Sequence, residues 1–109
     1  MDYMREELKK LGLTEEEVNI YLLLLQKGPL KVTRISKELS VARTTIYRFV
    51  TSLHEKGIIS EIIQDYVKIY TPIAPENLPE ILRNRIAEIE SIVPKLQKIY
   101  SKPLEKTEV

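Results

Sequence analysis

The sequence predicts a mainly α-helical fold with one small β-hairpin and a long C-terminal helix. Three observations predict it. Apolar residues recur at helical spacing in successive segments before Gly57, and the pattern then changes to two short runs of branched and aromatic residues. From Pro75 onward the apolar spacing is again close to that of a long helix. At 109 residues the chain can build one ordinary core, so we expect one domain with an appendage.

Residues that cap and stop helices define the first two predicted helices. A short helix starts at Asp2 and is ended by Gly12, because glycine adopts the left-handed conformation without penalty. The second helix follows Thr14, which forms a capping box with Glu17, and it stops at Gly28. Apolar residues cover most of its circumference, so we expect it to lie centrally between other elements.

Two further short helices follow, joined by a tight link. The spacing predicts one helix over about Val32 to Leu39 and another from Ala42 to Lys56. Each has one apolar side, which we expect to face the second helix. The predicted core stripe consists of Val18, Leu22, Leu25, Ile35, Ile46, Val50 and Leu53.

The outward face of the helix from Ala42 to Lys56 carries arginines and hydroxyl groups and almost no acid. Residues 27–56 hold seven bases, Lys56 included, against two acids, whereas the segments on either side are net negative. The net charge of the whole chain is only +1, which argues against a protein that coats nucleic acid everywhere. The concentrated charge instead points to one local anionic partner.

After Gly57 the pattern predicts two strands with a short turn. The expected pair is roughly Ile58 to Ile63 with Tyr66 to Thr71, and Pro72 ends the second strand because it cannot donate to a ladder. Two short helices with a tight turn, followed by such a hairpin, are typical of a winged helix-turn-helix. We therefore expect residues 1–74 to form a winged helix-turn-helix domain that binds DNA.

The last predicted helix runs from Pro75 to about Tyr100, with residues 101–109 as a frayed tail. Pro94 lies in its interior and removes one backbone hydrogen bond, so a kink or break is expected there. Its apolar stripe either folds back on the domain or pairs with a second copy of the chain. We favour a dimerisation helix over residues 75–100, because the helix is longer than so small a domain can cover. The predicted dimer contacts are Leu82, Ile86, Ile89, Val93, Leu96 and Ile99.

The basic helix suits the major groove of B-form DNA, which is about 12 Å wide and admits one α-helix. A carboxylate on its outward face would meet the phosphates, whereas arginine and threonine can donate to phosphates and base edges. Base-edge contacts are predicted for Arg43, Thr44 and Arg48. Phosphate contacts are predicted for Thr45, Tyr47 and Thr51, and for Lys31, Thr33 and Arg34 at the start of the preceding helix. At the hairpin, Gln64, Tyr66 and Lys68 are candidates for weaker contacts with the backbone or the minor groove.

The residue inventory argues against other classes of protein. The chain has no cysteine and one histidine, so neither a thiolate nor an imidazole metal site is expected. With only three glycines and no nucleophile and base in evidence, we expect neither a cofactor nor an enzyme. No long uncharged apolar run and no signal peptide is present, which predicts a cytoplasmic protein without a membrane partner.

Two stretches resemble a known family. LGLTEEEVNIYLLLL and RTTIYRFVTSLHEKGII, with the later IYTPIAPENLPEIL, are similar to the N-terminal winged-helix domain of the TrmB-like transcriptional regulators common in archaea. The resemblance spans about residues 6 to 100. It implies that the helix matching Ala42 to Lys56 enters the major groove and that the C-terminal helix pairs two chains. Sugar-responsive members continue into a separate ligand-binding domain, and this sequence ends at Val109, so we expect no small-molecule effector.

Two functions remain open from the residues. The first is a sequence-specific regulator that binds double-stranded DNA as a homodimer. The second is a winged-helix module within a larger assembly, in which the same helix meets a protein partner and no nucleic acid. The basic window favours the first.

Overall fold

The computed structural model describes residues 2–106, and side-chain surroundings for residues 3–101. The chain forms two compact units, Met1–Leu78 and Pro79–Val109. In order along the chain, the elements are α1 (Asp2–Lys9), α2 (Glu15–Lys27), α3 (Val32–Leu39), α4 (Arg43–Glu55), β1 (Ile59–Gln64), β2 (Val67–Pro72), a 3-10 turn (Pro75–Asn77) and α5 (Leu78–Lys106). The predicted fold class, a winged helix-turn-helix with a long C-terminal helix, is confirmed.

Helix α2 is the central helix of the first unit, as predicted. Its capping box is present: the Thr14 hydroxyl accepts from the Glu17 backbone N–H, and the Glu17 carboxylate accepts from the Thr14 N–H at 2.8 Å. The prediction that Leu25 belongs to the core is wrong, because its side chain is 39% exposed. A helix that is apolar nearly all round gives no periodicity to show which side meets its neighbours, and the buried side carries Leu24 instead.

The helix-turn-helix consists of α3 and α4, and its bounds agree closely with those predicted. Ser40 makes the turn in the left-handed conformation at φ 57°, and the Ser36 hydroxyl donates to the Val41 carbonyl across the turn. Helix α4 buries Ile46, Val50 and Leu53, the side predicted to face inward.

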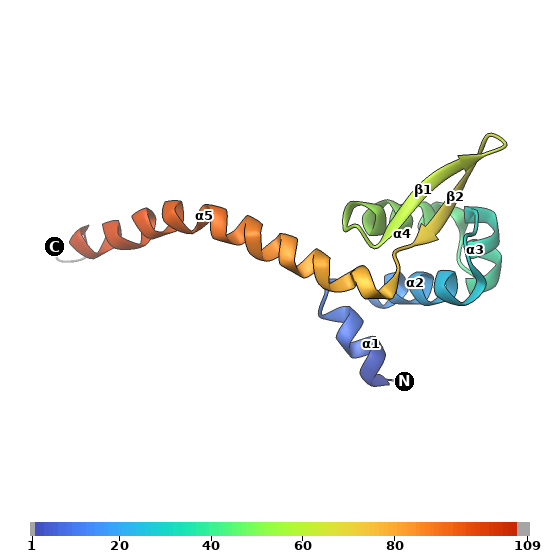
Figure 1. The fold of residues 1–109 in the computed structure, drawn as a ribbon, viewed down its shortest axis with the longest axis horizontal. Coiled ribbons are helices and arrows are strands. Elements are labelled where there is room, and N and C mark those ends of the chain that lie inside the picture. Colours follow the sequence, from blue (N-terminus) through green and yellow to red (C-terminus); the bar gives the residue numbers. More distant parts are fainter. Residues whose placement is uncertain (1, 107–109) are drawn as a thin grey trace. The chain divides into compact units, whose positions relative to one another are not determined.

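The antiparallel hairpin confirms the predicted strands, each displaced by one residue. Its register pairs Ile59 with Pro72 and Gln64 with Val67, and Leu30 forms a bridge to Tyr70 that ties the hairpin to the start of α3. Figure 1 shows the hairpin lying beside α4, with its turn projecting beyond the helices. Two buried residues of the strands, Ile59 and Tyr70, join the helical core.

Helix α5 forms the second unit and runs without interruption from Leu78 to Lys106. Of the kink or break expected at Pro94, the break is wrong, since the helix continues there despite the hydrogen bond that proline removes. The helix also extends beyond the predicted end near Tyr100 and continues through Pro103 to Lys106. The last part of the predicted tail, 107–109, lies outside the described residues. None of the helices within 2–106 combines the length and apolar character that crossing a membrane requires.

Candidate nucleic-acid interface

The outward face of α4 is exposed and cationic. Arg43, Thr44 and Arg48, the residues predicted to contact base edges, are all exposed. Within the described residues no carboxylate lies within ion-pair distance of either arginine, whereas many other bases of the chain are paired. The Arg48 guanidinium carbon lies 5.4 Å from the centroid of the Phe49 ring, which supports the side chain by a cation–π contact. The two arginines are therefore available to an external anion.

The hydroxyl-bearing residues of α4 differ in their surroundings. Tyr47 is exposed, whereas Thr45 is half-buried at the edge of the helix face. Thr51 is exposed, but its hydroxyl donates to the Tyr47 carbonyl at 2.8 Å, a bond within the helix. Because this bond occupies the Thr51 proton, Tyr47 is the better phosphate donor of the two.

The start of α3 presents unsatisfied backbone donors together with bases. Lys31 occupies the N-cap position and supplies no side-chain hydrogen bond, so the first N–H groups of the helix are not capped by it. Thr33 is exposed beside it. Arg34 pairs with Glu38 at 3.0 Å, and this hydrogen bond is the main cause that lowers the pKa of the Glu38 carboxyl. The pair is exposed, so it costs little to rearrange.

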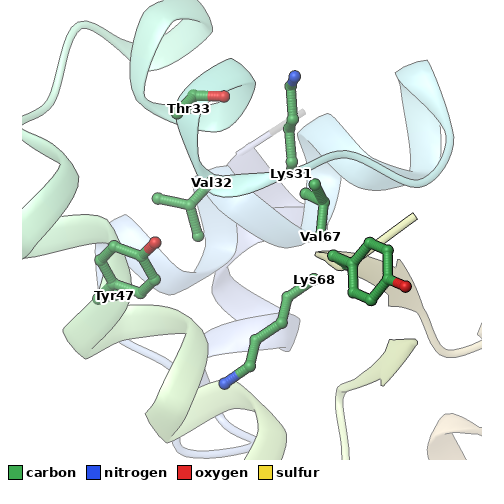
Figure 2. A pocket seen from close by; sticks show the side chains of 7 residues that line it. Lys31, Val32, Thr33, Tyr47, Val67 and Lys68 are labelled. Atoms are coloured by element: carbon green, nitrogen blue, oxygen red, sulfur yellow. The ribbon is translucent and has the colours of Figure 1, made fainter. Parts of the chain in front are cut away.

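A groove lies between the start of α3, the helix α4 and the hairpin. It has a volume of about 270 Å³ and is lined by Lys31, Val32, Thr33, Tyr47, Tyr66, Val67 and Lys68. Figure 2 shows Tyr47 on one side of the groove and Val67 with Lys68 on the other, with Lys31 and Thr33 at its α3 end. Five residues predicted separately to contact phosphates, the DNA backbone or the minor groove thus line one hollow: Lys31, Thr33, Tyr47, Tyr66 and Lys68.

The hairpin contributes one base and an apolar tip. Lys68 pairs with Glu61 of the opposite strand at 3.4 Å. Beyond this pair the exposed large apolar side chains are Ile62, Ile63, Tyr66 and Val67, and the acid Asp65 in the turn is exposed as well. Gln64, another predicted contact, is exposed next to the turn. The tip therefore offers apolar surface rather than positive charge.

Lys56 has a structural role that the sequence did not reveal. Although Lys56 was counted in the basic window, its amino group donates to the Glu17 carboxylate at 2.7 Å and to the Gly12 carbonyl at 2.7 Å. Glu17 is 1% exposed, so this pair neutralises a buried charge and fixes the end of α4 to the start of α2. No local sequence signal connects two residues so far apart in the chain.

Two of the three acids that open α2, Glu15 and Glu17, form ion pairs within the unit. Glu15 forms ion pairs with Lys9 and Arg5 of α1, and hydrogen bonds from these two bases lower the pKa of its carboxyl. Over the described part of the chain, no three His, Cys, Asp or Glu side chains gather as metal ligands would. Glu15 therefore attaches α1 to α2.

The six residues predicted to form a dimer contact share one feature: all are apolar and exposed along α5. They are Leu82, Ile86, Ile89, Val93, Leu96 and Ile99. A shallow apolar hollow on this helix is lined by Leu82, Arg85, Ile86, Ile89 and Glu90. The stripe is thus an apolar surface along a helix whose remaining exposed residues are mostly polar or charged.

The helix-turn-helix, its basic outer face and the hairpin beside it define a winged-helix protein of the transcriptional-regulator type. Residues 8–76 match the family model described as "Sugar-specific transcriptional regulator TrmB". This match covers more than half of the chain, and the chain therefore belongs to the TrmB family.

Two curated relatives are similar over most of this chain. The "HTH-type sugar sensing transcriptional regulator TrmBL1" of Pyrococcus furiosus is 36% identical over 96 residues, which are 87% of this chain and 28% of the relative. The "Uncharacterized protein YrhO" of Bacillus subtilis is 30% identical over 99 residues, or 91% of this chain and 34% of the relative. The chain thus spans about a third or less of the relatives it matches.

Solved structures share the fold. TrmBL2, described as an archaeal chromatin protein with a novel mode of DNA binding, aligns with 98% of this chain and 41% of its own, at a TM-score of 0.80 and 22% identity. A possible transcriptional regulator from Methanosarcina mazei Go1 aligns with 83% of this chain and 81% of its own, at a TM-score of 0.62 and 24% identity. At these identities the likeness supports the fold alone.

Proposed function

We propose that this chain is a transcriptional regulator, not an enzyme, which binds specific sequences of double-stranded DNA with α4 in the major groove. The observation that carries the proposal is the outer face of α4, where Arg43 and Arg48 are exposed and, within the described residues, have no carboxylate in ion-pair distance. Such a face suits a polyanion whose groove admits one helix. Because the curated relatives come from the prokaryotes Pyrococcus furiosus and Bacillus subtilis, we propose that the chain acts in the cytoplasm.

The residues divide into two kinds of contact. Arg43 and Arg48 are proposed to donate to guanine O6 and N7, and the Thr44 methyl to pack on a thymine methyl. These contacts give specificity. The phosphate contacts position the helix without selecting a sequence, and they come from Lys31, Thr33, Arg34, Thr45, Tyr47, Thr51 and Lys68.

The two parts of the chain are proposed to have separate roles. Residues 1–74 bind DNA, and the apolar stripe of α5 pairs with the same stripe of a second chain. A helix with a continuous exposed apolar stripe gains stability by burying it, and a two-fold dimer buries it on both copies. The dimer would present two α4 helices to a roughly palindromic site, with half-sites about 34 Å or a small multiple apart.

The relatives support a regulatory role. The TrmBL1 protein of Pyrococcus furiosus, 36% identical to this chain over 96 residues, is described as an HTH-type transcriptional regulator. The sugar sensing named for TrmBL1 belongs to a protein of which this chain covers 28%. We therefore propose DNA binding and transcriptional regulation for this chain, and we do not propose sugar sensing.

The test is a binding titration with duplexes selected from a random pool by the purified protein. We expect selected duplexes to bind far more tightly than random ones, and the affinity to fall steeply with salt as counterions are released from the phosphates. Binding to a protein partner with no duplex retained at low ionic strength would favour the alternative, a winged-helix interaction module. Equal affinity for selected and random duplexes would reject sequence specificity while leaving DNA binding in place.

A further inference from the structure

We propose that the groove between α4 and the hairpin seats one phosphate of the DNA backbone, with the Tyr47 hydroxyl and the Lys68 amino group as its donors. Glu61 is the counter-anion that this phosphate replaces. The inference rests on the proposed function and deepens it, because it joins residues of two separate elements in a single contact and adds an acid that regulates it.

The chemistry of the lining suits a phosphodiester. Two lysines, a threonine and two tyrosines contribute all the polar side-chain groups of the groove, and no acid lines it. In Figure 2 the amino groups of Lys31 and Lys68 lie at opposite ends of the view, with the Tyr47 ring to the side between them. Two amino groups, neutral hydroxyl donors and a lining without an acid suit a singly charged phosphate of the backbone.

The position of Tyr47 on α4 explains why a phosphate, and not a base, would reach the groove. A helix in the major groove is flanked by the two sugar-phosphate backbones, so its side residues meet phosphates while its outermost residues meet base edges. Tyr47 faces the hairpin, whereas Arg43 and Arg48 have no part in the lining. The hairpin would then lie against the DNA strand whose sugar-phosphate backbone passes beside α4.

Glu61 controls the availability of Lys68. Its carboxylate lies 3.4 Å from the Lys68 amino group, and the Lys68 side chain is exposed. An exposed pair of this kind is weak, and a DNA phosphate offers the same lysine a charge-assisted bond without breaking a buried contact. Glu61 therefore competes with the DNA phosphate for Lys68, and this competition lowers the affinity of the protein for DNA.

The experiment scans a selected duplex with methylphosphonates, each of which removes the charge of one backbone phosphate. Among the positions at which the substitution weakens wild-type binding, we expect one in each half-site to be the phosphate in the groove, with a loss of about tenfold for one charge-assisted hydrogen bond. In both Lys68→Ala and Tyr47→Phe, binding to unmodified DNA should weaken. The further loss at that same position should largely disappear in Lys68→Ala and should shrink in Tyr47→Phe, which keeps the lysine. Losses at all other positions should persist in both variants.

The control is Lys95→Ala, which removes the same charge from an exposed site on α5. Its methylphosphonate profile should match the wild type at every position. If both groove variants also keep the wild-type profile, the phosphate seat is overturned while DNA binding stands. If wild type retains no duplex at all, the proposed function fails together with the seat.

A second variant tests the acid directly. Glu61→Gln should strengthen binding of the unmodified duplex several-fold, because Lys68 loses its competing partner. The same substitution in a Lys68→Ala background isolates this effect from the change in net charge. A gain that persists undiminished without Lys68 would reject the role assigned to Glu61.

Discussion

The Lys56 amino group lies 2.7 Å from the carboxylate of Glu17, and this ion pair holds the end of α4 against the start of α2. Glu17 is buried and also completes the capping box of α2 through the Thr14 backbone N–H. Glu17 thus caps the start of α2 and also pairs with the lysine that follows α4. Because the helix proposed to meet DNA ends at this pair, the orientation of α4 depends on a contact far from its outer face.

Removing Lys56 should destabilise the fold. In Lys56→Ala the Glu17 charge is left buried without its cation, and we expect the free energy of unfolding to fall by about 2–3 kcal/mol. Urea unfolding followed by circular dichroism measures the change. Lys95→Ala serves as the matched control and should stay within about 0.5 kcal/mol of wild type. A Lys56→Ala protein as stable as the control would contradict the role of the pair.

Stability should also depend on pH through Glu17. Burial acts to raise the pKa of this carboxyl, but hydrogen bonds from Lys56, Ser52 and the Thr14 backbone outweigh it and lower the pKa below its ordinary 4.5. A carboxyl with a depressed folded-state pKa adds stability above its unfolded pKa and loses it as pH falls through the folded value.

The free energy of unfolding should therefore decline as pH is lowered through 4.5 and below. The pKa values of the Glu15 and Glu38 carboxyls are also lowered, so their contributions to stability should be lost over the same range of pH. Glu17→Gln should reduce the slope without abolishing it. An unchanged slope in that variant would show that Glu17 does not titrate as described.

The hairpin turn should accept a stabilising substitution. Its two central residues, Asp65 and Tyr66, have φ of 52° and 66°, a conformation that favours Asn-Gly and costs an ordinary residue about 1 kcal/mol. Tyr66 is fully exposed, so Tyr66→Gly removes strain with little loss of packing. After the entropy that glycine adds to the unfolded chain, we expect a gain of about 0.5 kcal/mol in urea unfolding. Val67→Gly, within β2, should instead destabilise the protein.

The apolar stripe of α5 should control the oligomeric state. Ile89→Glu places a charge within the stripe and should convert a dimer to a monomer in sedimentation equilibrium. Ser91→Glu adds the same charge on the opposite side of the helix and should leave the dimer intact. A wild-type protein that sediments as a monomer at high concentration would refute the proposed dimer.

The arginines of α4 should affect DNA affinity and leave stability unchanged. Arg43→Ala and Arg48→Ala should each weaken binding to the selected duplex by about 1–3 kcal/mol and relax specificity at one base pair. Both side chains are exposed, so unfolding should shift by less than about 0.5 kcal/mol. Fluorescence anisotropy of a labelled duplex measures the affinity. A variant that weakens selected and random duplexes equally would be a phosphate contact instead.

Much of the fold follows from local signals in the sequence. Thr14 with Glu17 marks the start of α2, and the apolar spacing of Ile46, Val50 and Leu53 sets the buried side of α4. Each of these signals involves residues only a few positions apart, so it can be recognised without knowing how the helices pack. The hairpin was predicted to within one residue for the same reason.

The errors involve relationships over longer distances. The exposure of Leu25 depends on which side of an all-apolar helix its neighbours cover, and the ion pair between Lys56 and Glu17 depends on how α4 packs against α2. The meeting of Tyr47 and Lys68 in one groove likewise requires the hairpin to be placed beside α4. Local pattern contains none of this packing information.

Methylation interference on a selected duplex tests most directly whether α4 lies in the major groove. Dimethyl sulfate methylates guanine N7 in the major groove and adenine N3 in the minor groove, so one experiment distinguishes the two. We predict interference at guanine N7 in each half-site for the wild type, with one of these signals lost in Arg43→Ala and another in Arg48→Ala. Interference confined to adenine N3, or guanine signals that both variants retain, would contradict the placement of α4.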